Sequence, residues 1–350
     1  MATGHMIFSV LDALCARLDA TISPAVKSYC SGSLRAPSAG LHPLMRRSLL
    51  LFASVLIALA VAPGHARPFF SRGTPQVHND TSPTDAERKD LFARTIANQH
   101  INDDALQLFE RIEHRVVHDH DISSGAGEDR TARIIPAGAG SARITLAEHG
   151  RPADLAAIQA QLALTERQLE AAVDPSNTQT QRDREKIERR NRERKELVGY
   201  VHEAFIFTWM GREVRDGRTL VKFRLDSNPN FKPPTFKAEF LRHATATAWV
   251  DEKSAELVRL EAVLTTDVSV MAGIVGKVYR NGHALLEQSE VEPGIWLPTL
   301  TQYDFTYRKF LFTSEVHERM EATHYRRVGP PAQALTAIRN EISATNHGQP

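Results

Sequence analysis

The sequence predicts an α+β fold: a curved antiparallel sheet of about eight strands, forming a half or partly open β-barrel, with helices before it and over it. Three observations support this prediction. Segments of alternating apolar and polar residues follow one another from Leu197 to Val328, separated by short turns. Helical patterns precede that region. All three tryptophans lie inside it, and large rings suit the concave face of a curved sheet.

The composition is typical of a globular protein with a packed core. The chain has 350 residues, 42% of them hydrophobic, and its 43 basic residues nearly balance its 42 acidic ones. This apolar content argues against a disordered chain or a protein with many membrane spans. The near-neutral charge argues against a nucleic-acid partner, because phosphate-binding domains carry a basic excess.

Residues 45–66 have the pattern of a secretory signal peptide. Met45-Arg46-Arg47 is positively charged, Ser48–Ala62 is apolar, and small residues precede a cleavage site between Ala66 and Arg67. We therefore expect a periplasmic or other extracytoplasmic protein, with residues 1–44 as an upstream extension outside the mature chain. The alternative is an uncleaved inner-membrane anchor over 48–62, although a spanning helix needs about 20 apolar residues.

Cleavage there would change the charge and the thiol content of the chain. Cys15 and Cys30 lie in the first 66 residues, together with five of the 43 basic and two of the 42 acidic residues. The mature chain would have a net charge of −2 and no cysteine. Disulfide bonds, thiol nucleophiles and cysteine-ligated metals are then excluded from its chemistry.

Residues 84–180 are expected to form the first part of the domain. Thr84–Glu87 has the spacing of a capping box and Asn102 offers a second cap, so we expect two short helices. The alternation from Thr131 to His149 predicts a hairpin. The apolar stripe from Pro152 to Val173 predicts a helix that serves as a lid over the sheet.

A charged helix is expected at residues 181–198. Arg182–Glu196 holds eight basic and five acidic residues, with opposite charges four apart, such as Glu185 with Arg189 and Glu188 with Arg192. Such pairs support a solvated helix or a charged linker. The alternative is a docking surface, which would make the protein an assembly or interaction module of the cell envelope.

The antiparallel half-barrel is expected at residues 199–329. Its clearest hairpin runs from Thr245 to Leu264 and turns at Asp251–Ser254. The residues on either side, 67–83 and 330–350, are expected to be a disordered leader and a C-terminal tail.

Apolar and aromatic residues that alternate along these strands are the candidates for lining a cavity on the concave face. The candidates are Phe205, Phe207, Trp209, Val221, Phe223, Leu225, Trp249, Leu260, Trp296, Tyr303 and Phe305.

His114, His118 and His120 form the densest group of residues that can bind a metal, beside Asp119 and Asp121. On a helix only His114 and His118 would lie together, and on a strand only the neighbours His118 and His120 would, because His114 lies four residues further along the strand. The group is thus a weak candidate for the centre of a metal-dependent periplasmic hydrolase. The sequence shows no motif of a catalytic site, and we expect no catalytic residues and no cofactor.

Three short motifs in the strand region resemble the periplasmic outer-membrane lipoprotein-sorting proteins of the LolA/LolB type. These are Trp249-Val250-Asp251, Arg259-Leu260-Glu261 and Gly294–Pro298, within a resemblance that covers about residues 200–328. The resemblance implies a half-barrel that receives acyl chains on its concave face. It implies a non-enzymatic carrier with a lipid or lipidated protein as its partner, and a membrane surface as a further partner.

Overall fold

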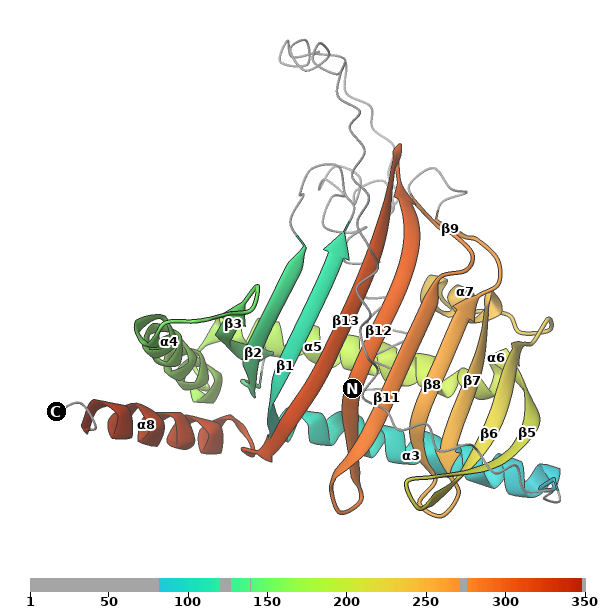
Figure 1. The fold of residues 1–350 in the computed structure, drawn as a ribbon, viewed down its shortest axis with the longest axis horizontal. Helices are drawn as coiled ribbons and strands as arrows, with labels where there is room; N and C mark the ends of the chain where they lie inside the picture. Colours follow the sequence, from blue (N-terminus) through green and yellow to red (C-terminus); the bar gives the residue numbers. More distant parts are fainter. Residues whose placement is uncertain (1–81, 120–126, 139, 271–275, 348–350) are drawn as a thin grey trace, which may run out of the picture. The chain divides into compact units, whose positions relative to one another are not determined.

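The computed structural model describes residues 82–119, 127–138, 140–270 and 276–347, and the structural statements below concern these residues (Figure 1). The chain divides into two units, and the described residues all belong to the larger one. The predicted signal peptide, its junction at Ala66 and Arg67, and most of the leader lie outside the described residues. Within the described ranges, no helix is long and apolar enough to cross a membrane.

One antiparallel sheet of 13 strands dominates the described chain. The strand order is β4-β3-β2-β1-β13-β12-β11-β8-β7-β6-β5, and the short strands β9 and β10 are attached beside β12. The strands are β1 (Phe109–Asp119), β2 (Glu128–Pro136), β3 (Ser141–Glu148), β4 (Arg151–Pro152), β5 (Phe205–Arg215), β6 (Arg218–Ser227), β7 (Ala244–Asp251), β8 (Glu256–Leu264), β9 (Val268–Val270), β10 (Gly276–Val278), β11 (His283–Glu292), β12 (Ile295–Lys309) and β13 (Phe312–Arg327).

The predicted α+β class and open antiparallel sheet are confirmed, but the count of about eight strands is wrong. Strands β1 to β4 come from the part of the chain before Leu197. They extend the same sheet, because β1 pairs with β13, the last strand of the chain. Strand β5 is the long edge strand. It contains a bulge after Trp209, where Gly211 adopts a φ of 109° that glycine tolerates without strain.

The helices lie before, between and after the strands. They are α3 (Asp85–Ala105), α4 (Leu155–Val173), α5 (Thr178–Gly199), α6 (Val201–Ala204), α7 (Phe236–Arg242) and α8 (Pro331–His347), with a 3-10 turn at Leu106–Leu108. The capping box at Thr84 and Glu87 is present at the start of α3. The expectation of two short helices is wrong, because α3 continues through Asn102 and the chain from Phe109 is strand β1. The charged segment expected at 181–198 lies within helix α5. Most of the segment expected to be a C-terminal tail, 330–350, forms helix α8, whose apolar side chains pack against α4.

The two faces of the sheet are covered by different helices. We call the face beneath α3 the inner face; directly paired residues such as Phe223, Ala248 and Leu260 lie on it. Helices α4 and α8 pack instead on the other face, around Ile135 and Ile144 of β2 and β3. The lid predicted from Pro152 to Val173 is therefore wrong: α4 packs against α8 and β3, and α3 is the helix that covers the inner face.

Polar side chains near the C-terminal end of α3 fasten it to the sheet. Asn102 is completely buried; its Nδ2 donates to Glu256 Oε2 at 2.8 Å, and its Oδ1 accepts from the Trp296 backbone N–H at 3.0 Å. Asn98 Nδ2 donates to the Ser254 carbonyl at 2.8 Å, in the turn between β7 and β8. One helix end thus contacts β8, β12 and a hairpin turn.

The buried carboxyl group of Glu256 is a weaker acid than an ordinary glutamate. Burial raises its pKa to about 7, and the nearby carboxylates of Asp251 and Glu290 act in the same direction, while the hydrogen bond from Asn102 opposes them. Arg218 bonds both Asp251 (3.4 Å) and Glu290 (2.6 Å), so the charge of those two carboxylates is partly compensated. With a pKa of about 7, Glu256 is mostly neutral at acidic pH and about half charged near pH 7.

Replacing Asn102 by Ala should destabilise the protein by about 2–4 kcal/mol, because it leaves Glu256 and the Trp296 N–H buried without partners. Chemical denaturation of both proteins measures this difference. Asn98→Ala is the matched control on the same helix: its bond to the Ser254 carbonyl is exposed and its bond to the Ala255 carbonyl is half-buried, so the expected loss is about 1 kcal/mol. Equal losses for the two variants would contradict the anchoring role of Asn102.

Glu256 should make the protein less stable as the pH rises from about 4.5 to 7. In that range the folded carboxyl keeps its proton while the unfolded one has lost it, so the free energy of unfolding falls by up to roughly 3 kcal/mol and then levels off. Glu256→Gln keeps an acceptor for Asn102 and should lack this component. Denaturation of both proteins at pH 5 and pH 8 tests this; parallel pH dependences would show that Glu256 does not contribute.

Candidate functional site: an apolar cavity beneath helix α3

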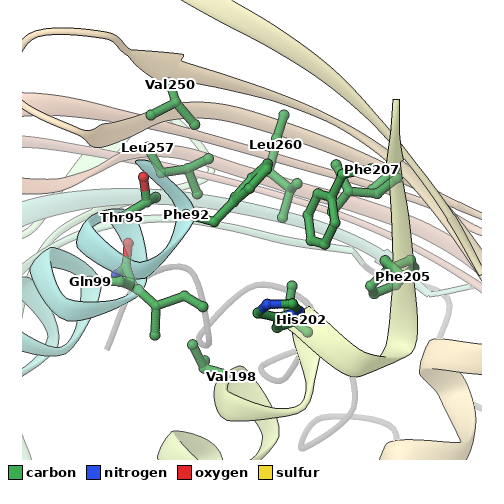
Figure 2. A pocket seen from close by; sticks show the side chains of 15 residues that line it. Phe92, Thr95, Gln99, Val198, His202, Phe205, Phe207, Val250, Leu257 and Leu260 are labelled. Atoms are coloured by element: carbon green, nitrogen blue, oxygen red, sulfur yellow. The ribbon is translucent and has the colours of Figure 1, made fainter. Parts of the chain in front are cut away.

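A cavity of about 100 Å³ lies between α3 and the inner face of strands β5 to β8 (Figure 2). Its lining is almost entirely apolar. The lining residues are Phe92, Thr95, Ile96, Gln99, Val198, Val201, His202, Phe205, Phe207, Leu225, Ala246, Ala248, Val250, Leu257 and Leu260.

The periodicity of each element places these side chains on the cavity. On α3, residues 92, 95, 96 and 99 lie on one helical face. On β7 the alternate residues Ala246, Ala248 and Val250 point inward, and their small size leaves room that larger side chains would fill. The cavity remains because the larger side chains of α3, such as Phe92, hold the helix away from the small alanine residues of β7.

Phe92 closes the cavity on one side. Its ring centroid lies 4.1 Å from that of Phe207 and 4.6 Å from that of Phe223, which fixes α3 against β5 and β6 by aromatic contacts. The hydrogen bonds of Asn98 and Asn102 to the sheet lie further along the helix. The part of α3 over the cavity therefore depends on apolar packing, which an apolar ligand can replace.

Polar groups in the lining are few, and most are already engaged. Thr95 donates to the Leu91 carbonyl at 2.8 Å, and Gln99 Nε2 donates to Asp103 Oδ1 at 2.9 Å. Gln99 Oε1 is buried without a hydrogen-bond partner, and His202 is exposed to solvent. The cavity thus suits an apolar occupant, with one buried acceptor available for a donor group.

The cavity is too small for an acyl chain in this conformation. A cavity of about 150 Å³ holds benzene, and pockets for larger ligands measure about 300–1,000 Å³. At about 100 Å³, this one accommodates only a few methylene groups. A longer chain would enter only if α3 and Phe92 moved away from the sheet.

Four of the eleven candidate residues line this cavity: Phe205, Phe207, Leu225 and Leu260. Phe223 is buried in the same core, in contact with Phe92 and Trp209. Tyr303 and Phe305 also belong to this core, but they lie on β12, two strands beyond β8.

Trp209 and Val221 line a second cleft, which lies at the start of α3. It measures about 900 Å³ and has both polar and apolar walls. The Arg212 guanidinium lies 5.0 Å from the Trp209 ring and bonds Glu252 at 2.6 Å across the cleft wall. This cleft is less apolar than the cavity under α3, and its charged groups already bond one another.

Trp249 and Trp296 do not line the cavity, which corrects the prediction for both. Trp249 is paired with Lys222 and Arg259 on the opposite face of the sheet, and its ring lies 4.8 Å from Lys222 Nζ. The Trp296 ring lies 4.9 Å from the Arg218 guanidinium. Trp249 stands between two inward-facing neighbours, Ala248 and Val250, so alternation alone assigns it to the outer face.

The histidine cluster provides no metal centre in the described chain. His114 bonds Asp129 at 2.9 Å, and His118 lies four residues further along β1, about 13 Å away. His120 lies outside the described residues. Among the described residues, no group of three His, Cys, Asp or Glu side chains could hold a metal ion.

The sequence prediction missed the cavity residues contributed by helices. These are Phe92, Thr95, Ile96 and Gln99 from α3, and Val198, Val201 and His202 from α5 and α6. The spacing of these residues along α3 indicates that they share one helix face. It does not indicate that this face lies over strands β5 to β8.

No protein-family model matches the sequence, and none of the curated proteins matches it. Among solved structures, the chain is similar to a DUF1329 family protein from Desulfovibrio piger, with 9% identity, 68% of this chain and 92% of that chain covered, and a TM-score of 0.25. It is similar to a domain described as an outer membrane lipoprotein-sorting protein, from Vibrio parahaemolyticus (8% identity, 67% and 93% covered, TM-score 0.25).

A third similar structure is a LolA superfamily protein from Nitrosomonas europaea, with 11% identity, 68% of this chain and 96% of that chain covered, and a TM-score of 0.20. All three identities are 11% or lower, and all three TM-scores are 0.25 or lower.

Proposed function

We propose that this protein is a non-enzymatic extracytoplasmic protein that binds the acyl chain of a lipid or a lipidated protein beneath α3. The observation that supports the proposal best is the cavity lining, in which twelve of the fifteen residues are apolar. Export by cleavage after Ala66 is part of the proposal, because it would bring the protein to the compartment where such ligands meet it.

In the proposed binding step, the acyl chain replaces Phe92 and its neighbours on the inner face while Asn102 holds the other end of α3. Each buried methylene contributes about 0.8 kcal/mol. Eight methylenes would contribute about 6 kcal/mol, from which the cost of association and of moving Phe92 away from Phe207 and Phe223 is subtracted. We therefore expect weak, reversible binding.

The lining gives no basis for catalysis. The Thr95 hydroxyl donates a hydrogen bond to the Leu91 carbonyl of its own helix, and His202 lies at the exposed edge of the cavity. A nucleophile and a base within hydrogen-bonding reach of one another are thus not found among the residues that line the cavity. This supports a binding role for the site.

Filling the cavity should weaken ligand binding without unfolding the protein. Ala248→Leu adds three carbon atoms to the inner face, where about 100 Å³ is free, and should weaken the binding of a fluorescent fatty acid at least tenfold. Thr247→Leu is the matched control: it adds apolar volume to the next residue of the same strand, on the opposite face. The control should bind the probe like the wild type.

Fluorescence titration with the probe, together with melting temperatures, measures both effects. Equal affinities of the wild type and the Ala248→Leu variant would contradict the proposal that the ligand binds in this cavity. Native mass spectrometry of protein exported from a bacterial host would show the mature N-terminus and any retained lipid. No retained lipid and no probe binding would together rule out the proposed function.

A further inference from the structure

The hairpin of β12 and β13 extends beyond the strands on either side of it (Figure 1). The pairing of β11 with β12 ends at Asp304, and the pairing of β1 with β13 ends at Val316. Five further residues of β12 continue for about 16 Å at 3.3 Å per residue. Among the described residues, only the short strand β10 accompanies this extension, opposite residues 307–309.

The end of this hairpin presents three consecutive large apolar side chains to solvent. Phe310 is 48% exposed, Leu311 91% and Phe312 64%. Phe310 has a φ of 52°, a conformation that favours glycine or asparagine and not a bulky ring. The backbone conformation of the turn therefore does not account for large apolar residues at these positions.

Other hairpins of the same sheet end in polar or small residues. The turn between β5 and β6 is Asp216-Gly217, that between β7 and β8 contains Glu252-Lys253-Ser254, and that between β11 and β12 is Pro293-Gly294. These are ordinary turn residues at a solvent boundary. The Phe310–Phe312 tip differs from these three described turns, and exposed apolar groups of this kind mark contact surfaces.

Basic residues outnumber acidic ones next to the tip. From Phe305 to Glu315 the sequence has two basic residues, Arg308 and Lys309, and one acidic residue, Glu315. Lys277 of β10 is paired with Arg308 in register, and it also bonds Asp267 at 2.6 Å. The tip thus combines an apolar end with positive charge directly behind it.

We propose that the Phe310–Phe312 tip inserts into the surface of an anionic lipid bilayer. Side chains at successive positions of a turn point in different directions, so one shaped protein groove does not readily take all three, whereas a fluid apolar layer does. An insertion of about 5–10 Å is typical of interfacial elements and matches a tip of three residues. Basic residues behind the tip would meet anionic headgroups at that depth.

A dye at the apex would report insertion locally. In a Cys15→Ser/Cys30→Ser background, Leu311→Cys carries an environment-sensitive label, and vesicles of phosphatidylethanolamine and phosphatidylglycerol are added. We expect a blue shift of the emission, quenching by lipids that carry a quencher in the upper acyl region, and a much smaller response with phosphatidylcholine vesicles. The matched control is labelled Ile206→Cys, an equally apolar exposed position on β5 at 52% exposure, which should not respond.

Unlabelled protein provides the second measurement. Leu311→Ser/Phe312→Ser should weaken co-sedimentation with the anionic vesicles at least tenfold without changing the melting temperature, since both side chains are exposed.

An unresponsive tip dye, or unchanged co-sedimentation of the double variant, would overturn the proposal. Equal responses to neutral and anionic vesicles would overturn its electrostatic part. The Ala248→Leu variant should still bind vesicles, so failure of the cavity proposal and of this one are distinguishable.

Discussion

The arrangement of the described chain depends on how the inner face of an open sheet is kept from water. A closed barrel would fill its own interior, but this sheet ends at β4 and β5, so a helix must cover the apolar residues between them. Asn102 holds that helix in place. It satisfies a backbone N–H of β12 and a carboxyl group of β8 with one fully buried side chain, and these contacts fix both the height and the direction of α3.

The same fastening divides α3 into two parts with different physical properties. From Asn98 on, hydrogen bonds with defined geometry join it to the sheet. Over the cavity, aromatic and aliphatic contacts hold it, and these are non-directional. A helix secured at one end by directional bonds and elsewhere by packing can yield locally without losing its register on the sheet.

Local patterns predicted much of the sheet and little of what covers it. Alternation identified the β7–β8 hairpin and four of the cavity residues, because the direction of a strand side chain follows from its position in the strand. Asn102 was misread as a helix cap, which is the usual role of asparagine in that context. Its actual partners lie 154 and 194 residues away, and no nearby sequence signal encodes them. The position of α3 over β5 to β8 is a long-range property of the same kind.

The bulge at Gly211 has a consequence for the behaviour of many copies of this protein together. Strand β5 has eleven residues and a neighbour on one side only, and a flat edge of that length would act as a template for another chain. The irregular register after Trp209 interrupts the row of backbone donors and acceptors that such a template needs. We therefore expect the open sheet to resist stacking edge to edge into longer assemblies, so that it can stay open without polymerising at high local concentration.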